Sequence, residues 1–303
     1  MSTSNAIKVT VTLYSFEPEY FSYQWSFEEY MRRASQVGGG DNMGLEIIAP
    51  MDNPDYPHVG KAFEVTFKQS CERNNLTPVS YSIYSDHAIP FASRPMTVDE
   101  SVDFMVCHFK TAVQLGFPKI RIQWHSYEIA EKLVPYAEKY KVWMGYEMHA
   151  PIMLGSEDGK KLVAQVKKVS SEYFGLIPDF GQFEGPEAMG TTSSEEQSKP
   201  PRPLEPGEYM SQGVIVRADK PEDIRPLVPY VKHVHGKWHR FVKGQIVGMP
   251  YEELVRVFCE EKYNGSWTME WEGRNYGEYK NGWEIVKGAY PLIKSWIAKY
   301  SKP

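Results

Sequence analysis

Apolar, β-branched runs alternate with longer amphipathic stretches along most of this chain. Short apolar runs favour strands, whereas apolar residues spaced three to four apart favour helices. The runs predict eight strands, over Lys8–Tyr14, Gly44–Ala49, Pro78–Tyr84, Lys119–Trp124, Val142–His149, Phe174–Asp179, Val231–His235 and Trp267–Glu272. The amphipathic stretches predict helices over Phe27–Gln36, Lys61–Asn74, Val98–Leu115, Tyr127–Lys139, Lys160–Val169, Tyr251–Glu260 and Trp283–Tyr300.

The number of strand–helix alternations limits the fold to two α/β architectures. Eight strands alternating with helices over 303 residues point to a closed (β/α)8 barrel or to an open doubly wound sheet. A Gly-rich phosphate-binding fingerprint is absent after the first predicted strand, which disfavours the dinucleotide-binding version of the open sheet. We therefore predict one (β/α)8 barrel domain spanning residues 1–303.

One stretch interrupts the alternation. Residues 184–213, after the sixth predicted strand, are rich in Pro, Ser and Glu and are too long for an ordinary connection. The stretch is either a solvated surface loop or a lid or partner-docking loop. In a barrel it would lie on the face that carries catalytic residues, because it follows the carboxyl end of a strand.

Composition narrows the class of protein. Hydrophobic residues make up 42% of the chain and charged residues 24%, which is enough for a large core. The net charge of −5 and the lack of a long basic run argue against nucleic acid as a partner. No apolar run approaches the roughly 20 residues that span a bilayer, and the polar start lacks a signal-peptide core. The three cysteines lie far apart and form no metal or disulfide pattern, so we expect a cytoplasmic protein.

Acidic and histidine side chains gather where the last four predicted strands end. The fifth strand ends in GYEMH, the sixth in IPDFG, the seventh in HVHGK and the eighth in MEWEG. Residues two apart on a strand point to the same face, so Glu147 and His149 would both project into the barrel mouth. Polar groups at this end of a barrel usually serve catalysis.

The convergence of these side chains predicts a site for one divalent metal ion. A single Glu or His near a strand end is more often structural than a ligand, but four on successive strands reverse that expectation. Crowded carboxylates raise one another's pKa values, a cost that a cation removes. One nitrogen with three oxygens and no thiolate suits Mn²⁺ first, with Mg²⁺, Co²⁺ or Zn²⁺ as alternatives. His235 is favoured over His233 because it lies nearer the strand end, and Glu270 is favoured over Glu272. The predicted ligands are Glu147, Asp179, His235 and Glu270.

The four strand-end motifs resemble those of the xylose-isomerase-like barrel superfamily of sugar isomerases, epimerases and dehydratases. The resemblance covers nearly the whole chain, from VTLYSF through GLEII to the last helix. In ketose epimerases of that group, Glu, Asp, His and Glu at the ends of strands five to eight hold one divalent ion, and the two Glu residues form a catalytic acid/base pair. The resemblance implies the same metal ligands here, and it implies catalytic roles for Glu147 and Glu270.

The chain departs from the epimerase pattern at three strand ends. The epimerases carry an Arg shortly after the His of strand seven, where this chain has Lys237 and a shifted Arg240. Strand five adds His149, a base near the predicted metal whose side-chain type changes charge near neutral pH. Strand eight ends in the unusual sequence EWEG.

These features resemble the large subunit of bacterial C-glycoside deglycosidases. The likeness rests on YS near the start, GLEII on strand two, EMHAP on strand five and EWEG on strand eight. Members of that family are metal-dependent, cleave the carbon–carbon bond between a 3-oxo sugar and a plant aromatic aglycone, and work with a small β-subunit of β-sandwich type. The resemblance therefore implies a carbon–carbon lyase with a glycoside substrate and a partner subunit in a hetero-oligomer.

The chemistry of that family implies further roles. A metal ion on the 3-oxo group would polarise the carbonyl, His149 would take the C2 proton, and β-elimination would release the aglycone. For the aromatic residues among the candidates, packing within the barrel is an equally good interpretation. The side chains expected to bind the substrate or donate a proton are Tyr14, His87, Trp124, His125, Lys237 and Glu272, with Trp238 as a further stacking residue.

Two functions stay open at this point. One is a lyase that acts on oxidised glycosides together with a second chain, and the other is a stand-alone isomerase or epimerase that acts on a free keto sugar. Both functions use the same fold, a bound metal ion and the abstraction of a proton from the substrate. They differ in the size of the substrate and in whether a partner chain is needed. The long insertion favours the lyase, because it indicates a reshaped mouth or a docking surface. The intact set of acids and histidines argues against a sugar-binding barrel without catalysis.

Overall fold

Eight parallel strands form the centre of the protein. The computed structural model describes residues 7–84, 88–89, 94–185, 203–205, 208–211, 214–276 and 280–301. The central strands are β1 (Lys8–Thr12), β2 (Met43–Ile48), β3 (Leu76–Ser82), β6 (Lys119–Ile122), β7 (Trp143–Met148), β8 (Phe174–Pro178), β11 (His233–Trp238) and β14 (Ser266–Trp271).

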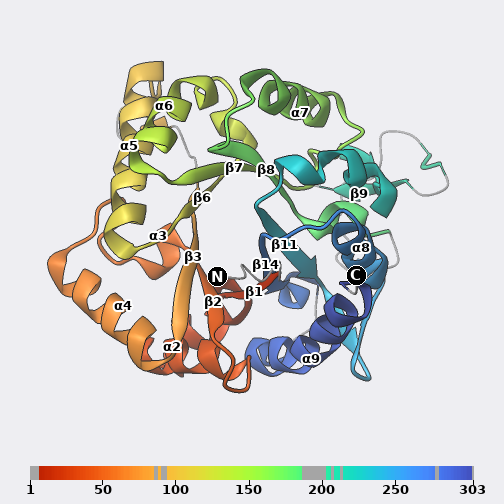
Figure 1. Cartoon of the computed structure of the whole chain (residues 1–303), viewed down its shortest axis with the longest axis horizontal. Coiled ribbons are helices and arrows are strands. Elements are labelled where there is room, and N and C mark those ends of the chain that lie inside the picture. Colours follow the sequence, from red (N-terminus) through yellow and green to blue (C-terminus); the bar gives the residue numbers. More distant parts are fainter. Residues whose placement is uncertain are drawn as a thin grey trace.

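The strands curl into a nearly closed barrel. They are hydrogen-bonded in the order β11-β14-β1-β2-β3-β6-β7-β8. Two isolated parallel bridges, Leu176↔Val231 and Asp179↔His235, connect β8 back to β11. This arrangement, with helices around it, confirms the predicted (β/α)8 barrel (Figure 1).

Helices surround the barrel and short elements fill its connections (Figure 1). The α-helices are α1 (Glu17–Phe21), α2 (Phe27–Gln36), α3 (Ala49–Asp52), α4 (Lys61–Arg73), α5 (Val98–Leu115), α6 (Ala130–Tyr140), α7 (Glu157–Val169), α8 (Tyr251–Glu260) and α9 (Gly282–Tyr300). The 3-10 helices are η1 (Leu13–Phe16), η3 (Trp124–Ser126), η4 (Phe180–Phe183), η5 (Pro221–Tyr230) and η6 (Gly273–Tyr276). The hairpin strands are β4 (Ala88–Ile89), β5 (Arg94–Pro95), β9 (Glu208–Ser211), β10 (Val214–Arg217), β12 (Arg240–Val242) and β13 (Gln245–Val247). Over the described ranges, none of these helices combines the length and apolarity needed to cross a membrane.

Local sequence explains where helix α5 begins and ends. Its first turn is a capping box, in which Thr97 Oγ1 accepts the Glu100 N–H at 3.2 Å and the Glu100 carboxylate accepts the Thr97 N–H at 2.8 Å. Its last turn is followed by Gly116, whose φ of 87° lies in the left-handed region that favours glycine. The helix therefore has the bounds that the sequence predicted.

Seven of the eight central strands end one or two residues earlier than the sequence predicted, and three of these ends lead into 3-10 helices. Thr12 ends β1 and caps η1 with its side chain. Trp124 begins η3 instead of ending β6. Asp179 follows β8 and accepts the Gly181 N–H at 2.7 Å, which starts η4. A 3-10 helix begins directly after each of these strand ends. The polar side chains there, such as that of Asp179, therefore lie at the rim of the barrel and not within the strands.

Part of the predicted insertion is described. Residues 186–202, 206–207 and 212–213 lie outside the described residues. Strand β9 lies within the insertion and pairs as an antiparallel hairpin with β10, which follows the insertion. Asp219, just beyond β10, accepts the N–H groups of Leu154 and Gly155 at 2.8 and 3.3 Å. These bonds tie the segment after the insertion and β10 to the loop after β7, at the carboxyl end of the barrel.

The inside of the barrel is polar. Outward-facing strand residues such as Leu45, Met144 and Met269 belong to the apolar core that packs against the helices. Residues at alternate positions contact one another across the interior. Lys119 Nζ on β6, for example, donates to Ser266 Oγ on β14 at 2.7 Å, although these strands lie on opposite sides of the barrel by strand order.

Gly175 on β8 offers a test of how tightly the barrel is packed. A Cβ atom there would lie 2.1 Å from the Tyr230 carbonyl oxygen and 2.8 Å from the Trp143 ring. We expect Gly175→Ala to lower the free energy of unfolding by about 1–3 kcal/mol, because relief of the clash requires a backbone shift of η5 or β8. The matched control is Gly155→Ala, whose Cβ would meet only Asp219 Oδ1 at 3.7 Å. Urea unfolding compares the two variants, and equal stabilities would contradict the expected clash.

Candidate functional site

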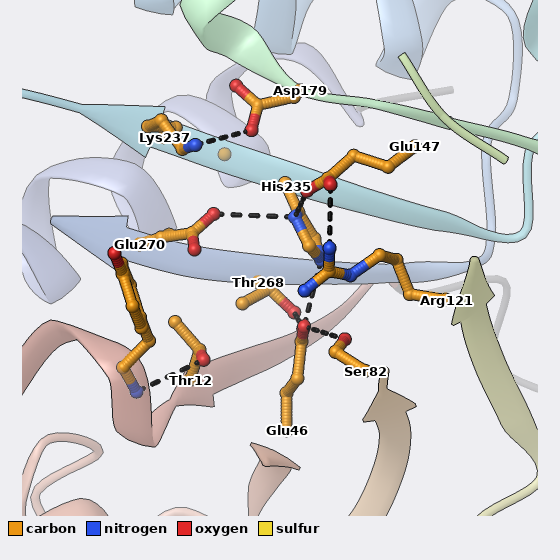
Figure 2. A network of polar contacts seen from close by, with 12 residues as sticks. Thr12, Glu46, Ser82, Arg121, Glu147, Asp179, His235, Lys237, Thr268 and Glu270 are labelled. Atoms are coloured by element: carbon orange, nitrogen blue, oxygen red, sulfur yellow. Dashed lines mark hydrogen bonds and ion pairs between the residues drawn. The ribbon is translucent and has the colours of Figure 1, made fainter. Parts of the chain in front are cut away.

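Three predicted ligands lie together at the carboxyl ends of neighbouring strands. One oxygen each of Glu147 and Asp179 and one ring nitrogen of His235 lie within 4.8 Å of one another. His235 Nδ1 is 2.8 Å from Glu147 Oε1 and 3.4 Å from Oε2 of the fourth predicted ligand, Glu270. All four side chains are buried, and Figure 2 shows them converging from separate strands. We call these four residues the acid–histidine cluster.

Two buried cations pair with the acid–histidine cluster. Arg121 Nη1 lies 2.8 Å from Glu147 Oε2. Lys237 Nζ lies 2.7 Å from Asp179 Oδ2 and 3.3 Å from Glu272 Oε1. Burial alone would lower the pKa of Lys237, but these carboxylates raise it well above its ordinary value. The two cations therefore stay charged and offset part of the negative charge inside the protein.

The carboxyl groups of the cluster differ in how readily they ionise. Burial raises the pKa of Glu270 to about 8, and neighbouring carboxylates add to the rise. Burial also opposes the ionisation of Glu147, yet the guanidinium of Arg121 holds the pKa of that carboxyl well below its ordinary value. The raised pKa of Glu270 indicates that the positive charges nearby do not fully balance the carboxylates of the cluster.

Several buried polar atoms of the acid–histidine cluster have no hydrogen-bond partner in the part of the chain that the structure describes. Over the described ranges, Asp179 Oδ2, Glu270 Oε2 and both ring nitrogens of His235 are buried without a hydrogen bond. Their short contacts with charged neighbours are ion pairs whose angles fall short of hydrogen-bond geometry. Buried polar atoms in this condition are rare in folded proteins and need a reason. A divalent cation would give Asp179 Oδ2, Glu270 Oε2 and His235 Nδ1 a partner, so the residues present fit the predicted metal.

The remaining polar candidates lie beside the cluster or outside the described residues. His149 directly follows β7 and is half-buried, with Nδ1 2.5 Å from the Ala150 carbonyl oxygen. Because it follows Met148, the last residue of β7, it lies at the same end of the barrel as Glu147. His87 lies outside the described residues.

The aromatic candidates fall into two groups. Tyr14 follows β1 and is partly buried, and Trp124 follows β6 at the same end of the barrel. Trp124 is 45% exposed and stacks on His125, with ring centroids 4.0 Å apart. Trp238, in contrast, is fully buried and packs edge-on against Tyr251 of α8. The expectation that Trp238 stacks on a substrate is therefore wrong, because its side chain faces the helices.

Two residues that touch the cluster were not predicted from the sequence. Glu46 Oε1 lies 2.8 Å from His235 Nε2, and Arg121 pairs with Glu147. Each is a charged residue inside a short buried strand, in the sequences MGLEII and KIRI. Charged residues are almost never fully buried unless they are paired. Their place within such strands was the signal that could have identified them.

Known proteins are similar to this chain over most of its length. The 3'-dehydrocarminate deglycosidase alpha subunit of Microbacterium sp is 28% identical over 332 residues, covering 95% of this chain and 94% of that protein. The C-glycoside deglycosidase alpha subunit of Microbacterium trichothecenolyticum is 25% identical, covering 94% of this chain and 89% of that protein.

The fold also has close structural neighbours. The crystal structure of D-psicose 3-epimerase from Clostridium cellulolyticum H10 with D-tagatose has a TM-score of 0.64 at 15% identity, covering 98% of this chain and 100% of the other. At that identity the likeness concerns the fold alone. The model of the xylose isomerase-like TIM barrel family matches residues 41–289. This chain therefore belongs to the xylose isomerase-like TIM barrel family.

Proposed function

We propose that this chain is the catalytic subunit of a divalent-metal-dependent C-glycoside deglycosidase. The observation that carries the proposal is the buried acid–histidine cluster with His149 at its edge. The names of the two deglycosidase relatives support the reaction class. The proposed substrate is a C-glycoside that is already oxidised at C3 of the sugar and carries a flavonoid-type aromatic aglycone.

The acid–histidine cluster would hold one divalent ion, with Mn²⁺ preferred. When bound, such an ion supplies Lewis-acid polarisation of a substrate carbonyl oxygen. Arg121 keeps Glu147 ionised and so ready to act as a ligand. Lys237 and Glu272 lie next to the cluster, where we propose that they bind oxygen atoms of the sugar.

His149 would start the reaction by taking the proton from C2 of the 3-oxo sugar. The electron pair left on C2 forms a double bond to C1 while the bond from C1 to the aglycone carbon breaks. The aglycone carbon then takes up a proton, for which we propose His125 or Lys237 as donor. Trp124, exposed and stacked on His125, offers a flat surface on which an aromatic aglycone can stack.

We also propose that the chain works with a small β-subunit in a hetero-oligomer. The two deglycosidase relatives are named alpha subunits, which implies a further subunit for each of them. The hairpin of β9 and β10 is held against the loop after β7 at the carboxyl end of the barrel, and it offers a surface for that partner.

Product analysis tests the proposed function directly. The chain is co-expressed with the proposed small β-subunit, supplied with Mn²⁺ and incubated with a 3-oxo C-glucoside of a flavonoid. We expect free aglycone by chromatography, and we expect none with Glu147→Ala. Omission of the partner tests whether the second subunit is required. Solvent deuterium exchange into a free keto sugar, without aglycone release, would instead assign the chain to the isomerases and epimerases.

A further inference from the structure

Glu46 lies inside the barrel directly beneath His235. Its Oε1 atom is 2.8 Å from His235 Nε2 and accepts the Ser82 hydroxyl at 2.5 Å. Its Oε2 atom is 2.8 Å from His233 Nε2 and accepts the Thr268 hydroxyl at 2.8 Å. All five side chains are buried. Figure 2 shows Glu46 reaching from β2 toward His235 on β11, on the side away from the other ligands.

The direction of the hydrogen bonds around His233 can be deduced. Lys119 can only donate, and its Nζ lies 2.7 Å from Ser266 Oγ. Ser266 has a single hydroxyl proton, and His233 Nδ1 at 2.6 Å is a nearer acceptor for it than the Lys232 carbonyl oxygen at 3.3 Å. A ring that accepts this proton on Nδ1 carries its own proton on Nε2, which faces Glu46 Oε2 at 2.8 Å.

The same reasoning extends to His235. With His233, Ser82 and Thr268 donating to it, Glu46 is an ionised carboxylate that only accepts. The ring nitrogen of His235 that faces Glu46 must therefore carry a proton. The other nitrogen, Nδ1, is the one that faces Glu147 and Glu270.

We propose that Glu46 is a positioning residue that holds His235 with its proton on Nε2, so that the lone pair of Nδ1 is presented to a divalent cation in the acid–histidine cluster. This inference rests on the proposed metal site and adds the residue that orients its only nitrogen ligand. Carboxylates that accept the second ring N–H of a ligating histidine fix its orientation and make it a better ligand.

A cation bound between Glu46, His233 and His235 is the competing arrangement. One ligand atom from each of these residues also lies within 4.8 Å of the others. This group, however, has one carboxylate, whereas the acid–histidine cluster has three. Both oxygens of Glu46 already accept hydrogen bonds, and Lys119 adds a positive charge nearby. A hard cation therefore favours the acid–histidine cluster.

Metal affinity in matched variants tests the role of Glu46. Glu46→Gln keeps the size of the side chain, but its single carbonyl oxygen cannot accept from both histidines. We expect its dissociation constants for Mn²⁺ and Co²⁺, measured by calorimetry, to rise about 10–100-fold. The visible spectrum of bound Co²⁺ should change as well. Thr268→Val removes a hydrogen bond to the same carboxylate without touching His235, and we expect less than a threefold change.

The outcomes separate this inference from the proposed function. If the unmodified chain binds no divalent ion, the metal site itself is wrong. If it binds one ion and Glu46→Gln binds it equally well with the same Co²⁺ spectrum, the positioning role is wrong although the site stands. Two bound ions would support the competing arrangement.

A measurement on the unmodified chain avoids any variant that fails to fold. Nitrogen-15 spectra of the Zn²⁺-loaded protein, with His235 assigned by comparison with His235→Gln, report which ring nitrogen carries a proton. We expect a protonated Nε2 and a metal-bound Nδ1. Zn²⁺ bound to Nε2 would overturn the proposal.

Discussion

Replacing His149 with alanine is expected to reduce aglycone release by about 10²–10⁴-fold while the divalent ion stays bound. His149 directly follows β7 at the barrel mouth, and its imidazole makes no ion pair with an acid of the cluster within the described residues. Removing it should therefore leave Glu147, Asp179, His235 and Glu270 in place. The measurement pairs turnover of the 3-oxo C-glucoside with elemental analysis of the purified protein.

The control for this variant is His125→Ala, a second histidine at the same end of the barrel. His125 stacks on exposed Trp124, so its loss should weaken substrate binding more than proton transfer from C2. Solvent exchange at C2 should be lost in His149→Ala and kept in His125→Ala. Retained turnover in His149→Ala would remove His149 from the mechanism, and loss of the metal in that variant would give it a structural role.

Glu147→Gln is expected to abolish metal binding at micromolar concentrations of Mn²⁺ and, with it, aglycone release. The Glu147 carboxylate lies between Arg121 Nη1 and His235 Nδ1, at 2.8 Å from each. A neutral amide cannot replace its charge toward a cation, and it leaves the buried guanidinium of Arg121 without a counter-ion. Calorimetric titration with Mn²⁺ and the thermal midpoint with and without the ion measure both effects.

Glu272→Gln is the matched control for Glu147→Gln. Glu272 is also an acid at the end of a strand, but it contacts Lys237 and His239 and is not among the predicted ligands. We expect this variant to bind Mn²⁺ with nearly unchanged affinity and to bind substrate less tightly. If Glu272→Gln loses the ion and Glu147→Gln keeps it, the ligand set predicted from the sequence is wrong.

The barrel fold could be predicted because the sequence patterns of its strands and helices lie within short segments of the chain. Strand and helix periods can be read in short windows, and α5 has the predicted bounds because its cap residues lie within a few positions of its ends. The segment Pro221–Tyr230 gave no such signal. Its three prolines remove backbone donors, so it forms the 3-10 helix η5 where the sheet needs a covering helix.

The interior of the barrel was harder to predict than its mouth. Neighbouring parallel strands of a barrel end at the same level. Residues at the strand ends, such as Glu147, Asp179 and Glu270, can therefore be predicted to lie close together from the strand assignments alone. Glu46 on β2 meets His235 on β11 although two strands, β14 and β1, lie between them in the sheet and 189 positions separate them in sequence. Such a contact depends on the curvature of the whole barrel, and no local pattern encodes it.

The pairing of the first central strand with the last one governs how this chain can fold as it is made. β1 lies between β2 and β14, with Lys8 opposite Ser266 and Val11 opposite Met269. One edge of β1 therefore stays without its neighbour until the ribosome has synthesised β14, where Ser266 lies 258 positions after its partner Lys8. An exposed parallel edge can pair with other unfinished chains. The nascent protein thus depends on its C-terminal strand for protection against aggregation during synthesis.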